Sequence, residues 1–325
     1  MPNWSEILVE IQGLQSQNVG NALDVVRRKY LKALAAHTGR NTIIYYSGWL
    51  NLDPNLRGLN IGDDDKTGFM TAIHKMDRSK GLDLVLHTPG GDIAATESIV
   101  AYLRSMFDTN IRAIVPQLAM SAGTMIACAT QEIILGNQSS LGPFDPQSNG
   151  ISMPAVLDEF QRALKEIKAD PACIPLWQVI IGKYHPTYLD SCHRASVMSR
   201  EIVGGWLKSG MFKDDPDGED KARKVVESLS NHDEHKTHAR HIHVDQCEAI
   251  GLKVKRLEGD PTLQDLVLSV HHACMHTCAM AQATKIIEND AGNCVIANVA
   301  PAFPAQFIPF MPFAPHLPPA VPPSK

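Results

Sequence analysis

Two short segments of this sequence place a serine and small residues where acyl-transfer chemistry needs them. The first, HTPGGD at residues 87–92, ends an expected strand, and its two glycines permit a tight turn and close backbone approach by a ligand. The second, AMSAGT at residues 119–124, puts Ser121 between an expected strand and an expected helix. A serine at such a junction lies beside free backbone N–H groups at the positive end of the helix dipole. Acyl transfer requires this combination of a nucleophile and N–H donors aimed at the developing oxyanion.

Each segment alone is a weak signal. A Pro-Gly-Gly turn is common, and Ser121 by itself fits a simple helix N-cap. Because the two segments occur in this order and one βαβ unit apart, together they favour a nucleophile that faces an oxyanion hole.

Alternating strands and helices are expected to position these segments. The predicted strands cover residues 42–46, 82–87, 111–115 and 132–135, and the predicted helices 66–76, 92–107 and 121–129. This alternation predicts an α/β fold of parallel βαβ units with right-handed crossovers. The uncharged stretch 113–131 approaches the length of a membrane span, but Pro116 and Gly123 within it favour a buried strand followed by a buried helix.

The flanking sequence is expected to be mainly helical. Helices are predicted at residues 4–36, 154–168, 187–208, 221–231 and 261–288, with an edge strand at 252–258. The chain then divides into four predicted segments. These are an N-terminal helical segment (1–40), a catalytic core (41–150), a helical continuation and oligomerisation region with a short strand (151–300), and a flexible Pro-rich tail (301–325).

Composition narrows the function classes. The chain has 325 residues, of which 44% are apolar and 20% charged, so it can bury a substantial core. A net charge of −5 gives no global basic excess for nucleic acid. Seven scattered cysteines, and an N-terminus that carries Glu6 and Glu10, predict reduced thiols, no signal peptide and a cytoplasmic protein. No membrane span is expected.

Four segments of the chain resemble a known family. They are TGRNTIIYYSGWL (38–50), LVLHTPGGDI (84–93), AMSAGTMIA (119–127) and SSLGPFDPQ (139–147). KYHPTYL (183–189) and EAIGLKV (248–254) give weaker support. Over about residues 20–290 the chain resembles the serine dehydrogenase proteinase family, within the crotonase-like superfold of the Clp protease and signal peptide peptidase A. The resemblance implies a Clp-like spiral of βαβ units with additional C-terminal helices, a serine peptidase activity, a peptide or protein substrate and a homo-oligomer. No dinucleotide fingerprint follows a strand and no pyridoxal-phosphate signature occurs, so no cofactor is expected.

The resemblance also implies roles for particular residues. Ser121 would be the nucleophile, the N–H groups of Gly91 and Ala122 would form the oxyanion hole, and Gly90 would support their turn. Clp-type enzymes place a histidine about 25 residues after the serine, whereas this sequence reads Gly-Pro-Phe-Asp-Pro at 142–146. The relatives of signal peptide peptidase A use a lysine instead, in a Ser-Lys dyad.

Two lysines are rival candidates for the base. Lys165 lies 44 residues after Ser121, as in soluble archaeal relatives. Lys183 follows the apolar run WQVIIG, and a lysine held in apolar surroundings loses its proton more easily. Both also fit ordinary solvated lysines. His185 is a third, weaker candidate, and Ser140 could orient whichever base is used.

The stretch 232–243 holds five histidines in twelve residues. Its spacing lacks the usual zinc motifs, so no metal site is expected. The family resemblance implies that this stretch is a surface element before the predicted strand at 252–258. Similarly, His271, Cys274 and Cys278 share a helix face, and packing explains them better than a ligand does.

Three function classes remain. The first is a cytoplasmic serine peptidase. The second, an acyl-CoA enzyme of the same fold, is disfavoured because such enzymes usually carry acidic residues where Ser121 stands. The third is an inactive peptidase fold that binds peptides, or that assembles with a partner through its Pro-rich tail. The tail holds nine of the 21 prolines, and an end without a binding role explains it more simply.

Overall fold

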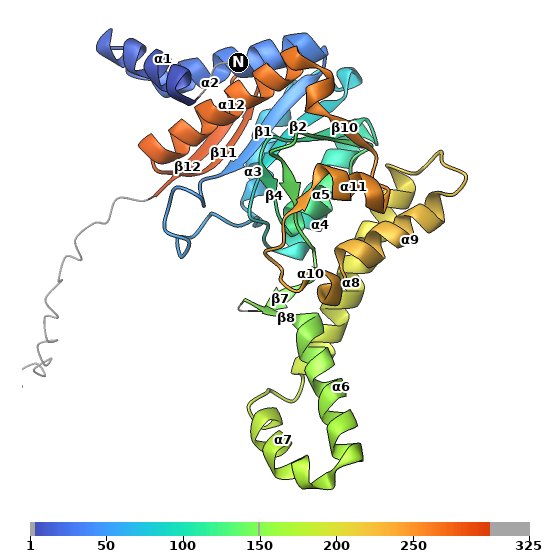
Figure 1. Ribbon diagram of the computed structural model, residues 1–325. Helices are drawn as coiled ribbons and strands as arrows, with labels where there is room; N and C mark the ends of the chain where they lie inside the picture. The colour runs from blue at the N-terminus through green and yellow to red at the C-terminus, as the bar shows by residue number, and fades with distance from the viewer. Residues whose placement is uncertain (1–3, 149, 300–325) are drawn as a thin grey trace, which may run out of the picture.

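One seven-stranded sheet organises the chain, as the alternating pattern predicts. The computed structural model describes residues 4–148 and 150–299. The strand order is β10-β5-β3-β2-β1-β11-β12 (Figure 1). The strands are β1 (Asn41–Ser47), β2 (Leu82–His87), β3 (Ile111–Val115), β5 (Glu132–Leu135), β10 (Val254–Arg256), β11 (Ala283–Asn289) and β12 (Cys294–Asn298). From β10 to β1 neighbouring strands are parallel, whereas β11 and β12 join antiparallel. The predicted α/β fold class is confirmed.

Side chains alternate between the two faces of the sheet with the period of two that strands impose. On β1, Tyr45 packs against Phe69 on one face, with ring centroids 5.5 Å apart. Its neighbour Tyr46 faces the other side, where its ring lies 5.8 Å from that of His271. The strands β1, β2, β3 and β5 therefore each contribute to two hydrophobic cores, one on each face of the sheet.

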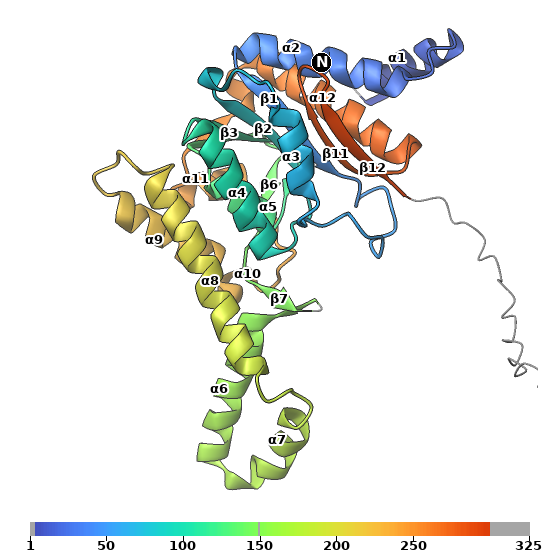
Figure 2. The ribbon, with the colours of Figure 1, turned by 180° about the vertical axis from the view of Figure 1, so that it is seen from behind.

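Helices cover both faces. The face of Tyr46 lies under α2 (Ala22–Thr38) and α12 (Pro261–Met280), with α1 (Trp4–Ser16) packed beside them (Figure 1). The face of Tyr45 carries α3 (Asp65–Ile73), α4 (Ile93–Phe107) and α5 (Ala122–Cys128) (Figure 2). Asp92 caps α4 as predicted, since its carboxylate accepts a 2.8 Å hydrogen bond from the N–H of Ala95.

An arm of helices extends from the sheet (Figures 1 and 2). It consists of α6 (Met153–Ala169), α7 (Ile174–Ile181) and the first part of α8 (Tyr188–Ser209). The chain returns through α9 (Gly218–Leu229), α10 (His232–His235) and α11 (Val244–Ile250). Short 3-10 helices occur at Arg78–Lys80, Pro171–Cys173 and Leu257–Gly259. The remaining short strands are β4 (Leu118–Ala119), β6 (Ser140–Leu141), β7 (Gln147–Ser148), β8 (Ile151–Ser152) and β9 (Ile242–His243).

The structure corrects one prediction clearly. The helix expected over 261–288 ends at Met280, and Ala283–Asn289 forms β11 between β1 and β12. The apolar spacing of this segment resembles the end of a helix, but pairing on both sides fixes it as a strand. The helix expected over 4–36 is also divided, into α1 and α2.

The uncharged stretch 113–131 contains the end of β3, then β4 and α5, as predicted. Within the described ranges, no helix combines the length and the apolar character that crossing a bilayer requires. The predicted tail, 301–325, lies outside the described residues.

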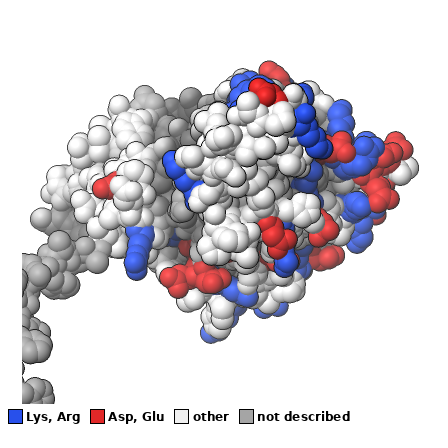
Figure 3. Space-filling model, turned by 90° about the horizontal axis from the view of Figure 1, so that it is seen from below, with Lys and Arg blue, Asp and Glu red and all other residues white. Residues whose placement is uncertain are grey.

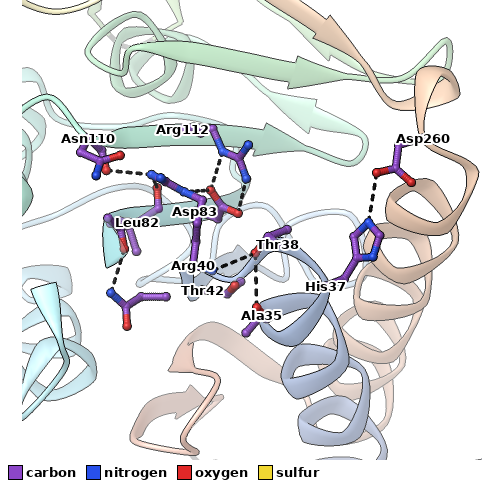
Figure 4. Close-up of polar contacts among 12 residues, drawn as sticks. Ala35, His37, Thr38, Arg40, Thr42, Leu82, Asp83, Asn110, Arg112 and Asp260 are labelled. Carbon is purple, nitrogen blue, oxygen red and sulfur yellow. Dashed lines mark hydrogen bonds and ion pairs between the residues drawn. The ribbon is translucent and has the colours of Figure 1, made fainter. Parts of the chain in front are cut away.

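The amino ends of β1, β2 and β3 are joined by a buried ion cluster (Figure 4). Asp83 is fully buried, and its carboxylate accepts hydrogen bonds from Arg40 at 2.8 Å and from Arg112 at 2.7 Å. A buried carboxylate requires such compensation. This cluster stabilises the amino ends of the strands. The segments HTPGGD (87–92) and AMSAGT (119–124) follow the carboxyl ends, at the opposite edge of the sheet.

Candidate active site

The two motif segments meet at the carboxyl ends of β2 and β3. Thr88 and Ala119 form an isolated parallel bridge, in which Thr88 accepts from the N–H of Met120 at 3.0 Å and donates to the carbonyl of Leu118 at 3.1 Å. This bridge brings the glycine turn alongside Ser121.

Both glycines are required by the backbone. Gly90 has φ +99°, and a Cβ there would lie 2.7 Å from the Cβ of Ser121 and 3.0 Å from the nitrogen of Ala122. A Cβ on Gly91 would collide with the backbone nitrogen and oxygen of Ile61. Only glycine permits this close approach of three chain segments.

Ser121 occupies a strained position at the start of α5. Its φ of 52° and ψ of −117° lie outside the favoured regions for a residue with a side chain, at a cost of about 1–3 kcal/mol. Although it stands at the N-cap, its side chain makes no capping hydrogen bond. In the part of the chain that the structure describes, its hydroxyl has no hydrogen-bond partner. The simple N-cap interpretation therefore fails, and the hydroxyl is available for chemistry.

Two backbone N–H groups in the segments that meet here are candidate donors. The N–H of Ala122 opens α5, where a helix leaves its first N–H groups unpaired. The N–H of Gly91 belongs to the glycine turn. Neither donates a hydrogen bond to any described residue. An oxyanion hole requires two such donors, and the positive end of a helix dipole would reinforce it.

A buried lysine holds the outer side of this turn. The ammonium of Lys285 lies 3.0 Å from the carbonyl oxygen of Asn60, 3.1 Å from the carboxylate of Asp65 and 2.9 Å from the hydroxyl of Tyr45. Burial lowers the pKa of Lys285, and the charge of Asp65 opposes that shift. The residue after Asn60, Ile61, donates to the carbonyl of Gly90 at 2.8 Å. Lys285 therefore supports the oxyanion turn through one loop.

Ser121 opens into a cleft of about 520 Å³. Its walls come from the loop before α3, the glycine turn, α5, the segment 144–153, α8 and the loop after α10. The lining residues are Asn60, Pro89, Gly90, Gly91, Asp92, Ile93, Ser121, Met125, Phe144, Pro146, Gln147, Met153, Ala195 and His238. Figure 3 views the molecule from below, with the arm of α6 and α7 nearest the viewer, and much of this face carries no Lys, Arg, Asp or Glu side chain.

One histidine that was not among the predicted site residues lines this cleft. His238 lines the cleft, and its Nδ1 lies 2.8 Å from the carboxylate of Asp145. Burial alone would raise the pKa of Asp145, but hydrogen bonds from His238 and Ser152 and the charge of His238 lower it overall. The sequence features that contain this pair are the Asp of GPFDPQ and the histidine-rich stretch 232–243. More than ninety residues separate the two, so their pairing could not be read from spacing.

The predicted lysines lie elsewhere. Lys165 is exposed on α6, twelve residues beyond Met153, which places it about 18 Å along the helix from the cleft. Lys183 is exposed between α7 and α8, so it is not held in apolar surroundings. His185 is also exposed, and its Nδ1 contacts the hydroxyl of Thr187 at 3.0 Å. None of the three lines the cleft of its own chain.

Ser140 is buried on β6, and its hydroxyl lies 3.1 Å from Nδ1 of His243. It contacts neither lysine. Across the described residues, no group of three or more His, Cys, Asp or Glu side chains is arranged to hold a metal ion.

A serine at a strand-to-helix junction that meets a glycine turn, on a mainly parallel sheet, is typical of Clp-like α/β folds. The family model for ClpP-like SDH-type serine proteinases matches residues 21–261. The chain therefore belongs to this family, and the predicted family and its Clp-like fold are confirmed.

Two curated relatives come from the archaeon Methanocaldococcus jannaschii. Uncharacterized protein MJ0137 is 30% identical over 191 residues, which cover 59% of each chain. Uncharacterized protein MJ1495 is 26% identical over 191 residues, covering 59% of this chain and 58% of the relative. The matched region thus spans less than two thirds of these relatives, and their names assign no activity.

Proposed function

We propose that this protein is a serine peptidase that hydrolyses peptide bonds with Ser121 as its nucleophile. The observation that carries the proposal is the hydroxyl of Ser121, which lies at a strained backbone position and has no hydrogen-bond partner among the described residues. The N–H groups of Gly91 and Ala122 likewise have no partner there. Membership of a serine proteinase family supports the same reaction.

In this mechanism the oxygen of Ser121 attacks the carbonyl carbon of the substrate peptide. The carbonyl oxygen becomes an oxyanion, which accepts hydrogen bonds from the N–H groups of Gly91 and Ala122. Collapse of the intermediate releases the amine product and leaves an acyl-enzyme, which water hydrolyses. The cleft of about 520 Å³ accommodates an extended peptide across Ser121.

A base must accept the proton of Ser121. Lys165 and Lys183 are the candidates from the family resemblance, and either one would make the mechanism a Ser-Lys dyad. Because both lie on the arm, they would act in the cleft of a neighbouring copy. A homo-oligomer is part of the proposal, and exposed apolar side chains on the arm support it. Leu164, Leu176 and Val179 are 53%, 62% and 65% exposed.

Active-site labelling tests the peptidase proposal. A fluorophosphonate probe, followed by peptide mass mapping, should place an adduct on Ser121 of the wild type and none on Ser121→Ala. Peptide hydrolysis should be lost in the same variant. A folded wild type that is never labelled would favour a peptide-binding scaffold or an acyl-CoA enzyme. We further propose a cytoplasmic location, which fractionation of cells that produce the protein would test.

A further inference from the structure

A buried carboxylate stands behind one wall of the Ser121 cleft. Asp145 is 1% exposed and lies in the loop that follows β6. Both of its oxygens are engaged: Oδ1 lies 2.8 Å from Nδ1 of His238, and Oδ2 accepts from the hydroxyl of Ser152 at 2.8 Å. Nδ1 of His232 lies 3.5 Å from Oδ2. These partners compensate a charge that would be costly to bury alone.

The loop of Asp145 is tied to the helix of the nucleophile. The N–H of Gly142 donates to the hydroxyl of Thr124 on α5 at 2.9 Å, and that hydroxyl donates to the carbonyl of Ala119 at 2.8 Å. Further along, the N–H of Phe144 donates to the carbonyl of Leu229 at 3.1 Å. The position of Asp145 is thus fixed relative to Ser121 by a short series of hydrogen bonds.

Asp145 also selects the protonation form of His238. An ionised carboxylate only accepts, so Nδ1 of His238 must carry the proton that it donates. The neutral ring then has its lone pair on Nε2, the atom that a general base needs. Within the described residues Nε2 has no hydrogen-bond partner. The side chain is 19% exposed and lines the cleft that also contains Ser121.

We propose that His238, oriented by Asp145, is the general base and acid that serves Ser121 in the same chain. This inference rests on the proposed peptidase function and replaces only its lysine. Ser121 and His238 are not hydrogen-bonded to each other in the structure, and contacts of this kind often tighten when substrate binds.

The proton transfers balance. As the Ser121 oxygen bonds to the carbonyl carbon, its proton moves to Nε2 of His238. When the carbon–nitrogen bond breaks, that proton moves to the leaving amine. Water then attacks the acyl-enzyme and gives a proton to Nε2, and the same proton returns to the oxygen of Ser121 as the acid product leaves. Asp145 stays ionised throughout and stabilises the transient imidazolium.

The rate of fluorophosphonate labelling at Ser121 tests this assignment. The variants are His238→Gln, Asp145→Asn, Lys165→Ala and Lys183→Ala, each checked for folding by thermal unfolding. His241→Gln is the matched control, because His241 is an exposed histidine three residues further along the same segment. Labelling of His238→Gln should be about 10²–10⁴-fold slower than labelling of the wild type. His241→Gln should label at the wild-type rate, and the two lysine variants show whether a base on the arm is needed instead.

Asp145→Asn separates positioning from catalysis. Its amide can donate to Nδ1, which favours the wrong tautomer, so labelling should slow while the protein still folds. Wild-type labelling rates in folded His238→Gln would overturn the inference and leave the peptidase proposal intact. A loss confined to Lys165→Ala or Lys183→Ala would also overturn it and place the base on the arm. Absence of any adduct on wild-type Ser121 would overturn both proposals.

Discussion

Ile61 pairs with Gly91 as an isolated parallel bridge, and its backbone holds the residues on both sides of that glycine. The N–H of Ile61 donates to the carbonyl of Gly90 at 2.8 Å, and its carbonyl accepts from the N–H of Asp92 at 3.0 Å. Both peptide groups that flank Gly91 are therefore fixed, while the N–H of Gly91 itself stays unpaired. The loop after β1 thus fixes the backbone around Gly91 without accepting a hydrogen bond from the N–H of Gly91.

Gly91→Ala should abolish the activity of the site. The new Cβ would collide with the backbone of Ile61, so the turn must move and the N–H of residue 91 leaves its position. Loss of one oxyanion-hole donor costs about 10²–10³ in rate. Peptide hydrolysis and labelling of Ser121 measure this loss. Gly20→Ala is the control, because a Cβ there meets nothing within 4 Å. Equal rates in the two variants would contradict the role of Gly91.

Lys285→Met should weaken both the fold and the turn. The substitution removes the ammonium that contacts Asn60 and leaves Asp65 buried without its cationic partner. Breaking a buried ion pair costs about 3–5 kcal/mol of unfolding free energy. Chemical denaturation measures that change. The double variant with Asp65→Asn should recover much of the stability, because no unpaired charge is left. A double variant as unstable as the sum of the single ones would contradict this account.

The sequence was informative where structure is local. Strands such as 42–46 and the helix after Asp92 were predictable because β-branched runs and capping residues act within a few positions. The glycine turn and Ser121 were predictable as a pair, since consecutive strand ends meet at one edge of a parallel sheet. The family resemblance extended this to the Clp-like fold.

What the sequence did not predict depends on long-range contacts. The strand β11 is defined by its pairing with β1 and β12, so its own apolar pattern was ambiguous between helix and strand. Likewise, His238 meets Asp145 across a sequence separation of 93 residues. The lysine candidates came from spacing and resemblance, which carry no information about an arm that extends from the sheet.

The arm should mediate association between copies. Leu176 and Val179 expose most of their apolar surface on α7, and burial of such surface drives association. In the double variant Leu176→Glu and Val179→Glu, two charges would have to be desolvated at that interface. Analytical ultracentrifugation should therefore report a smaller mass than for the wild type. A wild type that sediments as a monomer, or a variant of unchanged mass, would show that the arm has another role.

Asp83→Asn should destabilise the fold without altering the chemistry of the site. It removes the charge that Arg40 and Arg112 surround, so two partly buried guanidinium groups lose their counter-ion (Figure 4). We expect a loss of about 3–5 kcal/mol in unfolding free energy. Asp260→Asn is the matched control: it ends the exposed pair with His37 but can still cap α12, so its loss should stay below about 1 kcal/mol. Similar losses of unfolding free energy in Asp83→Asn and Asp260→Asn would contradict the expected difference between a buried and an exposed ion pair. Ser121 labelling of folded Asp83→Asn should equal that of the wild type.

His271 should make the fold sensitive to mild acid. Burial, followed by the charge of His272, lowers the pKa of His271 from 6.5 to about 3. Between those values the unfolded chain binds a proton that the folded protein does not, so stability falls as the pH drops from 6.5 toward 3. The slope from one such group reaches about 1.4 kcal/mol per pH unit. His87, buried beside it with its pKa also lowered, adds in the same direction.

Urea unfolding from pH 4 to 8 should therefore show a shallower pH dependence for His271→Gln than for the wild type. Because both proteins retain His87, identical slopes would mean that His271 titrates alike in the folded and unfolded chains.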